Sequence, residues 1–288
     1  MLFGQGRQTV TIRTRDRFGL IEAAGMRPCQ IKTFRQEQHF TPLALCIFCH
    51  LSCTLQVSIR LATLAGDQWS EPITIAEGPD LVANWADFPR SAMGGDDARY
   101  VHGLHRSGES PYAYEIQLYR LDDGTVESLG VMHRDGTPTE HGFVSMVPTT
   151  DGVRLFWLDG RAQVDGGPTA LYTTTAGSVI ETAELLDDRV CDCCQTDAAV
   201  TGMGPLVTYR DRSADERRDI AVAGLGTGVT SVHEDGWQIA GCPVTWRPLS
   251  KRTFASALFK ARASSSVKPK TPTLEKGIML SAVRNCAQ

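Results

Sequence analysis

Apolar and polar residues alternate along the middle of the chain in short runs that recur about every 50–57 residues. Strict alternation of this kind is typical of a half-buried β-strand. The strictly alternating runs are SIRLATLAGD (58–67), AYEIQLYRLDDG (113–124), TALYTTTAG (169–177) and RRDIAVAGLG (217–226). Ile59, Ile116, Leu171 and Ile220 occupy equivalent places in them, at spacings of 57, 55 and 49 residues. The pattern therefore predicts one strand of the same kind in each of four repeats.

Three other types of run accompany the alternating one. Short small-residue runs cover 86–96, 142–152 and 196–204, apolar runs ending in charge cover 99–110, 153–166 and 204–216, and weaker runs cover 69–80, 126–136, 180–188 and 229–237. Four strands per unit, joined by Gly and Asp turns, are typical of a propeller blade. Few windows show helical spacing of apolar residues. The sequence predicts an all-β fold, a β-propeller with about four blades in residues 54–244; the alternative, a β-sandwich, would not show a four-strand repeat.

The repeat stops at both ends of this region. Residues 1–53 form an irregular or leader segment, and residues 245–288, rich in Lys, Ser and Pro, are expected to be a basic, disordered tail. Because a six-bladed ring needs more residues than 54–244, truncation or a change of reading frame is expected at both ends. An alternative for the first segment is a secretory signal that starts at Met26, runs through the apolar stretch 40–51 and places Cys53 as a lipoprotein cysteine.

Charge is distributed unevenly between these regions. Residues 54–244 contain 13 Lys and Arg against 29 Asp and Glu, a net charge of −16, whereas both end segments are basic. An acidic body repels phosphate backbones, so nucleic acid is not an expected partner. No run of 18 apolar residues occurs, and a transmembrane helix is therefore not predicted.

Several segments carry a resemblance to a known family. They are NWADFP (84–89), DGTPTEHGFVS (135–145), WLDGR (157–161), RVCDCCQTDAAV (189–200), YRDRS (209–213) and DGWQIAGCPV (235–244). About two thirds of the chain resembles bacterial sialidase-like, BNR-repeat β-propellers. The Asp-box of sialidases, Ser-x-Asp-x-Gly-x-Thr-Trp, is reduced here to residues 121–124 (LDDG). The resemblance implies a six-bladed propeller, of which about four blades are present, acting on or binding glycans as an exo-α-sialidase-type hydrolase. It also implies a secreted, periplasmic or lipid-anchored protein.

In a propeller, the segments that lead into the inner strands crowd around the axis at one face. The repeat places Asn84, Trp85, Asp87, Glu140 and His141 in such segments, and Arg161, Arg210, Asp211 and Arg212 at the ends of second strands. A sialidase needs guanidinium groups for the sugar carboxylate, a tyrosine nucleophile and a carboxylic acid.

The resemblance thus assigns substrate binding to Trp85, Arg161, Arg210, Asp211 and Arg212. It assigns catalysis to Tyr209, Asp87 or Glu140, and His141 could act as an acid or base. The alternative is that Asp and Arg at the blade corners pair with each other. His133 and His233 precede Asp-Gly turns in the fourth runs, where turn packing explains them better than catalysis.

Four of the nine cysteines, Cys191, Cys193, Cys194 and Cys242, fall within the repeat. The Cys-x-Cys-Cys run and Cys242 open successive inner strands, so the four sulfurs are expected to approach one another. Disulfides that tie blade to blade are the favoured interpretation, each of the adjacent Cys193 and Cys194 having a distant partner. The alternatives are a zinc or copper site, completed by His141, and free buried thiols.

Three functions remain open from the sequence. The first is a glycan-acting enzyme or binder, whose partner is a carbohydrate; the second is a non-hydrolytic propeller with a Cys-based metal or redox site; the third is a scaffold fragment without activity. Arginines, a tyrosine and an acid around one pocket would favour the enzyme, and convergent sulfurs without disulfide bonds would favour the metal. Nothing in the sequence indicates an oligomeric state.

Overall fold

The computed structural model describes residues 53–65, 68–84, 86–241 and 276–286, together with short strands at 9–12, 15–16 and 19–20. Side chains are described for 57–63, 68–84 and 86–241. Trp85, Cys242 and the apolar stretch 40–51 lie outside the described residues. The described part is nearly all β, and its helical content is a single 3-10 turn, η1 (Arg161–Asp165). The all-β prediction is confirmed.

Three antiparallel meanders of four strands follow one another along the chain. They are β7 (Ser91–Met93), β8 (Arg99–Arg106), β9 (Tyr114–Asp122) and β10 (Thr125–Val131); β11 (His141–Thr149), β12 (Gly152–Asp159), β13 (Ala170–Ala176) and β14 (Glu184–Asp187); and β15 (Asp197–Thr201), β16 (Gly204–Arg210), β17 (Ile220–Ala223) and β18 (Thr230–His233). Each meander reproduces the four predicted runs in order. Ile116, Leu171 and Ile220 lie in the third strands, as predicted.

The first sheet is built differently, because segments far apart in the sequence join it. β4 (Cys53–Ala65), which contains Ile59, pairs with β6 (Ile73–Gly78) and β5 (Gln68–Trp69). On its other side β4 pairs antiparallel with β19 (Lys276–Cys286), which in turn pairs with β1 (Thr9–Ile12). A separate hairpin joins β2 (Arg15–Asp16) to β3 (Gly19–Leu20). The division of the chain at residues 53/54 and 244/245 stays a prediction.

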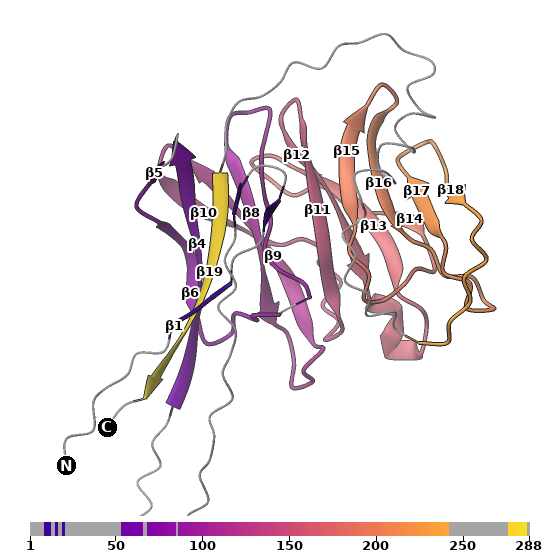
Figure 1. The fold of residues 1–288 in the computed structure, drawn as a ribbon, viewed down its shortest axis with the longest axis horizontal. Helices are drawn as coiled ribbons and strands as arrows, with labels where there is room; N and C mark the ends of the chain where they lie inside the picture. The colour runs from indigo at the N-terminus through magenta and orange to yellow at the C-terminus, as the bar shows by residue number, and fades with distance from the viewer. Residues whose placement is uncertain are drawn as a thin grey trace, which may run out of the picture.

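The sheets stand side by side in chain order, each packed against the next (Figure 1). The first strand of the third sheet, β11, contacts β7 and β9 of the preceding meander and β15 of the following one. Strand β12 shows why alternation suits this arrangement. Leu155 and Trp157 point into the apolar core shared with the preceding meander, and Phe156 and Leu158 into the core shared with the following one. Apolar side chains therefore cover both faces of this sheet.

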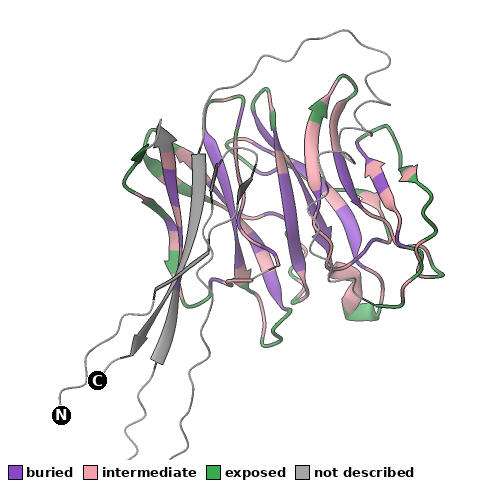
Figure 2. Cartoon of the chain, in the orientation of Figure 1, coloured by how far each residue is buried: buried purple, intermediate pink, exposed green. Residues whose placement is uncertain are grey.

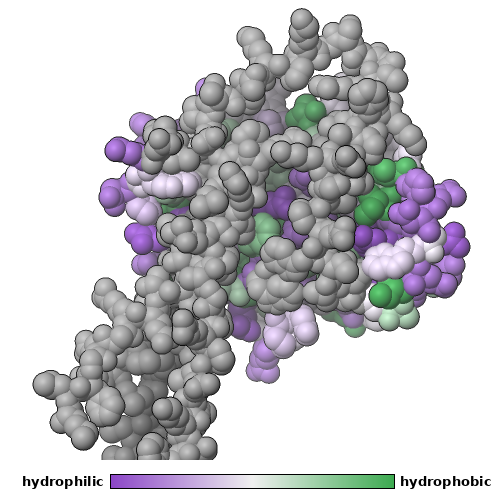
Figure 3. All heavy atoms as spheres, viewed as in Figure 1, coloured by the Kyte–Doolittle hydropathy of each residue, from purple (hydrophilic) through white to green (hydrophobic). Residues whose placement is uncertain are grey.

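Burial follows the same plan (Figure 2), with the buried residues concentrated in the central strands β8, β9, β11 and β12. Where the space-filling view shows described residues at the outer rim, hydrophilic side chains dominate and a few apolar ones interrupt them (Figure 3). A series of meanders with shared cores differs from the two facing sheets of the β-sandwich alternative. The charged ends of the second strands are thus held on a rigid, apolar framework.

Gly95 is a point where two neighbouring meanders touch backbone to backbone. Its N–H lies 3.0 Å from the carbonyl oxygen of Thr149 and 3.2 Å from that of Gly152, and a Cβ at Gly95 would collide with the Thr149 oxygen. We expect Gly95→Ala to lower the free energy of unfolding by about 1–3 kcal/mol, because neither backbone can yield easily. Chemical denaturation measures this.

Gly124→Ala is the matched control. Gly124 has φ +78°, but nothing lies within 4 Å of a Cβ built there. Its substitution costs only the backbone strain, about 1 kcal/mol. A loss for Gly95→Ala no greater than that of the control would contradict the close packing of the two meanders.

Candidate functional site

Two carboxyl groups and a phenol meet where three chain segments enter their sheets. Asp87 lies in the loop before β7, Tyr114 opens β9, and Glu140 immediately precedes β11. The Tyr114 hydroxyl donates to Glu140 Oε1 at 2.5 Å, and Asn84 Nδ2 lies 3.4 Å from the same hydroxyl. A parallel bridge between Tyr114 and Glu140 fixes the two backbones together. We call Asp87, Tyr114 and Glu140 the carboxylate–tyrosine cluster.

The backbone at the start of β11 is bent around Asp87. Asp87 Oδ2 accepts a hydrogen bond from the Phe143 N–H at 2.8 Å. Phe143 has φ +55°, an unfavourable conformation for a bulky residue, and lies where the β11–β12 register shifts between Gly142 and Ser145. A Cβ at Gly142 would collide with Asp87 Oδ2, so glycine leaves the room that the carboxyl group occupies. Strain of this kind is often found at functional sites.

The pKa values of all three cluster residues are raised above their usual range. Burial raises the pKa of Asp87 to about 7, and the neighbouring Glu140 charge adds to the shift. Burial also raises the pKa of Glu140, with Asp192 contributing, although the hydrogen bond from Tyr114 opposes it. Burial and the two carboxylates raise the pKa of Tyr114. Carboxyl groups that keep a proton near neutral pH can act as general acids.

A second cluster of charged side chains is formed by His141, Asp159 and Arg161. Arg161 pairs bidentately with Asp159, at 2.8 Å from Nε to Oδ1 and 2.7 Å from Nη2 to Oδ2, and Trp157 Nε1 donates to Asp159 Oδ2 at 2.8 Å. The Arg161 guanidinium stacks 3.9 Å above the Tyr172 ring. His141 Nε2 lies 3.5 Å from Asp159 Oδ1. Asp159 is fully buried, so these partners compensate its charge.

His141 is held between two carboxylates. Its Nε2 lies 3.2 Å from Asp135 Oδ2, and its Nδ1 lies 3.1 Å from the carbonyl oxygen of Thr139. Burial lowers the pKa of His141, but Asp135 and Asp159 outweigh it and raise the value to about 9. His141 is therefore an imidazolium at neutral pH, and it balances buried negative charge instead of acting as a free base.

His133, Asp135 and His141 bring their ligand atoms within 4.8 Å of one another, as a metal site would. The two imidazole rings, however, are stacked with centroids 3.7 Å apart and an angle of 1° between their planes. A metal ion must lie near the plane of each imidazole that binds it, and two parallel, stacked planes have no common point. The arrangement suits a protonated ion-pair network better than a metal.

The arginines to which the resemblance assigns substrate binding are paired with other groups of the protein. Arg161 is paired with Asp159, Arg212 with Glu216 and Asp192 at 2.7 and 2.9 Å, and Arg210 donates to the Arg218 carbonyl and stacks on Trp237. Asp211 accepts the N–H of its neighbour Arg212. This is the pairing of blade-corner Asp and Arg that the sequence left as an alternative.

Tyr209 is not part of the carboxylate–tyrosine cluster. Its hydroxyl donates to Asp187 at 2.5 Å, and its ring packs in the core between the β11–β14 and β15–β18 sheets. Tyr114 lies beside Glu140 instead. Tyr114 is absent from the site residues predicted from the sequence, because those came only from inner-strand entries and second-strand ends. The signal that could have found Tyr114 is its place at the start of an alternating run, next to the segments already nominated.

The cysteines form disulfide bonds, as the favoured interpretation expected, but not with the predicted pairing. Cys191 and Cys194 are joined to each other, and Cys193 is also disulfide-bonded. The expectation that Cys194 seeks a distant partner and ties blade to blade is wrong, because a three-residue separation already allows a Cα distance of 5.8 Å. The bonded pair forms a Cys-x-x-Cys motif, which overlaps the Cys-x-Cys-Cys run of the same segment. Bonded sulfurs lack the thiolate charge that binds zinc or copper.

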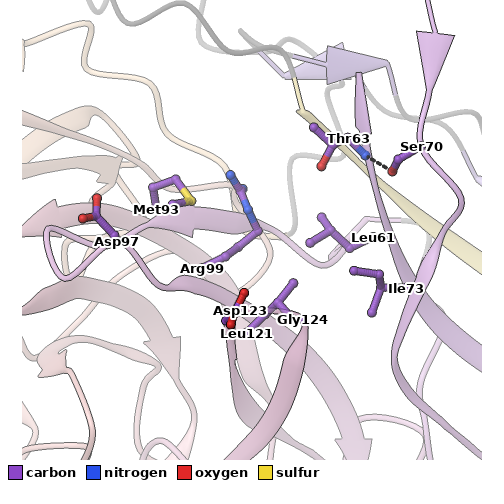
Figure 4. Close-up of a pocket in the computed structure, with 10 residues that line it drawn as sticks. All are labelled: Leu61, Thr63, Ser70, Ile73, Met93, Asp97, Arg99, Leu121, Asp123 and Gly124. Carbon is purple, nitrogen blue, oxygen red and sulfur yellow. Dashed lines mark hydrogen bonds between the residues drawn. The ribbon is translucent and has the colours of Figure 1, made fainter. Parts of the chain in front are cut away.

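A separate hollow of about 200 Å³ lies between the first sheet and the turns of the β7–β10 meander (Figure 4). Its lining includes Leu61 and Ile73 on one side and Arg99 and Asp123 on the other. None of the carboxylate–tyrosine cluster lines it.

The part of the chain that the structure describes contains no helix with the length and apolar character needed to cross a lipid bilayer.

Comparisons with known proteins identify no family for this chain. No protein-family model matches the chain, and no curated protein matches it. Among solved structures, it is similar to an alpha-L-arabinofuranosidase from Lactobacillus brevis, with a TM-score of 0.39 and 12% sequence identity over 56% of this chain and 59% of that one. The chain thus spans less than two thirds of that protein's length. A likeness this weak carries no argument about chemistry, and membership of the sialidase-like family is not shown.

Proposed function

We propose that this chain is a glycan-directed hydrolase on a β-propeller scaffold, in which Glu140 is the reacting carboxyl group. The observation that carries the proposal is the 2.5 Å hydrogen bond from Tyr114 to Glu140, made beside the buried Asp87. The series of meanders joined through β7, β11 and β15 supports the propeller. Segments entering the first strands supply Asp87 and Glu140, as is usual for sites at propeller axes.

Glycoside hydrolysis requires a carboxylic acid that protonates the leaving oxygen and a second group that either activates the attacking water or attacks the sugar itself. Glu140 is partly exposed, whereas Asp87 and Tyr114 are almost fully buried, at 2% and 1%. Glu140 is therefore the group that a bound sugar meets. Its raised pKa favours proton donation, Tyr114 fixes its orientation, and Asp87 lies beside it as a buried carboxyl group with a pKa of about 7.

The charge around the cluster favours a neutral sugar over a sialoside. Glu140 interacts electrostatically with both Asp87 and Asp192 at this site. The three arginines nominated for a sugar carboxylate are paired with protein groups. An anionic substrate would have to displace one of those pairs and pay its desolvation. We therefore expect turnover of neutral glycosides to exceed that of sialosides.

The test is hydrolysis of chromogenic neutral glycosides and a fluorogenic sialoside by the full chain. We expect Glu140→Gln to lower kcat/KM about a hundredfold, because it removes the transferable proton and keeps the shape. Glu127→Gln, a matched change on exposed β10, should leave kcat/KM unchanged. Absence of turnover by the unmodified chain, or equal activity of the two variants, would overturn the proposal.

A further inference from the structure

The loop between β14 and β15 contains three cysteines, Cys191, Cys193 and Cys194, together with the acidic residue Asp192. Its first half is anchored to the β15–β18 sheet, because Cys191 N–H donates to the Arg210 carbonyl at 3.0 Å. Its end is anchored to β11, because the Thr196 hydroxyl donates to the Phe143 carbonyl at 2.6 Å. Between these fixed points the Cys191–Cys194 disulfide closes a ring of four residues. Opening that bond would remove one restraint from residues 192–195 while leaving both anchors and the separate disulfide of Cys193 in place.

The two sulfurs differ in environment. Cys191 is fully buried, and its Sγ accepts a hydrogen bond from Arg218 Nη1 at 3.4 Å. Arg218 is itself only 2% exposed and is paired with Glu216 at 2.7 Å. Cys194 is partly exposed. A guanidinium beside a sulfur stabilises the thiolate, and the accessible sulfur of a Cys-x-x-Cys pair is the one that an external thiol attacks.

The same loop packs onto the carboxylate–tyrosine cluster. Asp192, between the two cysteines, is paired with Arg212 at 2.9 Å and contributes to the electrostatic environment of Glu140. Gln195, one residue after Cys194, donates to the carbonyl oxygen of Ala86, next to Asp87, and accepts from Arg90 Nη2 at 3.0 Å. Residues on either side of Cys194 thus lie near the cluster: Asp192 acts electrostatically on Glu140, and Gln195 contacts Ala86, the residue before Asp87.

We propose that Cys191–Cys194 is a thiol–disulfide exchange site that takes two electrons from a dithiol. One thiolate of the dithiol attacks Cys194 Sγ, the Cys191–Cys194 bond breaks, and Cys191 leaves as a thiolate beside Arg218. The second thiol of the reagent then attacks the mixed disulfide, releasing Cys194, which takes up a proton. The reagent leaves as its own disulfide, so the two electrons and all sulfur atoms are accounted for.

The proposed exchange site depends only on the Cys191–Cys194 disulfide and on Arg218. Its consequence rests on the proposed function: reduction should loosen Asp192 and Gln195 from the cluster and lower hydrolysis. The exchange and its effect on hydrolysis are measured separately, so either can be contradicted without the other. Thiol content reports the exchange, and glycoside turnover reports the consequence.

The experiment is a titration of the full chain with reduced and oxidised dithiothreitol, followed by alkylation and peptide mass analysis at each cysteine. We expect Cys191 and Cys194 to open together, at a lower ratio of reduced to oxidised reagent than Cys193, the internal reference. In Arg218→Met the ratio required should rise about tenfold, because the thiolate loses a charged hydrogen-bond donor. Arg218→Lys should restore part of this shift.

Opening of Cys191 and Cys194 no earlier than Cys193 in the unmodified chain would overturn the proposal, even if the Arg218 variants fail to fold. An unchanged ratio in folded Arg218→Met would overturn the role of the guanidinium. If the pair opens as expected and turnover of a neutral glycoside is unchanged, exchange stands and its link to the cluster is wrong. If no glycoside is turned over in either state, the proposed function fails and the exchange site does not.

Discussion

Replacing His141 by Gln is expected to lower the free energy of unfolding at pH 7 by about 3–5 kcal/mol. The imidazolium lies 3.2 Å from Asp135 and 3.5 Å from Asp159, and neither the histidine nor Asp159 is exposed to solvent. Glutamine cannot carry the charge, so Asp135 and Asp159 would keep Arg161 and their other hydrogen-bond partners but lose the imidazolium that lies between them. Leaving a buried charge uncompensated is among the most destabilising changes that a single substitution makes.

The pH dependence identifies the group responsible. Because Asp135 and Asp159 raise the pKa of folded His141 to about 9, above its value of about 6.5 in unfolded chains, folding stabilises the protonated form. This contribution is fully present below about pH 6.5 and is lost as the pH rises through 9. Chemical denaturation between pH 6 and 10 should show the decline in the unmodified chain and not in His141→Gln.

His233→Gln is the matched control for His141→Gln. His233 Nδ1 lies 2.9 Å from Asp235, but its side chain is 77% exposed. Surface pairs contribute at most about 1 kcal/mol, so this variant should unfold almost as the unmodified chain does. Similar losses for the two variants, or an unchanged slope near pH 9 in His141→Gln, would show that the buried network is not charged as described.

Replacing Asp87 by Asn is expected to stabilise the chain at pH 8 by about 1–3 kcal/mol and to leave it nearly unchanged at pH 4. Burial raises the folded pKa of Asp87 from 3.8 to about 7, so folding favours the protonated form. That stability is present below about pH 3.8 and is lost as the pH rises through 7. Asparagine stays neutral at every pH, and its amide oxygen can still accept the Phe143 N–H.

Asp151→Asn, in the exposed turn between β11 and β12, is the control and should show no such pH-dependent gain. Denaturation curves of the three proteins at pH 4, 6 and 8 measure the effect. If Asp87→Asn is less stable than the unmodified chain at pH 8, the carboxylate is compensated by its surroundings and the raised pKa is wrong. A gain in stability with a loss of turnover is the pattern expected of a residue kept for function.

The sequence by itself determined where the strands of the three meanders lie. The alternating run around Ile116 and the turn residues Asp123 and Gly124 specify a strand and its end within a dozen residues, so no distant contact is needed. Repetition of the pattern at Leu171 and Ile220 then predicted successive four-strand sheets, which the structure confirms. It also brought Asp87 and Glu140 forward, because both precede first strands.

Only the tertiary structure decided which side chains meet. Tyr114 and Tyr209 both sit in strands, but the first lies beside Glu140 and the second beside Asp187, and packing between neighbouring sheets chooses between them. The shift of register after Gly142 redirects β11 around Asp87, and one extra residue of this kind leaves no period-two signal to detect.

Charge pairing was likewise hidden from the sequence. Arg161 and Arg212 could have faced a ligand or a neighbouring carboxylate. Asp159 and Glu216 are close to them in the sequence, but the direction in which each side chain points, which the sequence does not specify, decides whether such neighbours pair. The Cys191–Cys194 bond depended on how tightly one loop turns between its two anchors. Local periodicity thus fixed the strands, whereas the chemistry of the candidate site depended on packing between sheets that are separate in the sequence.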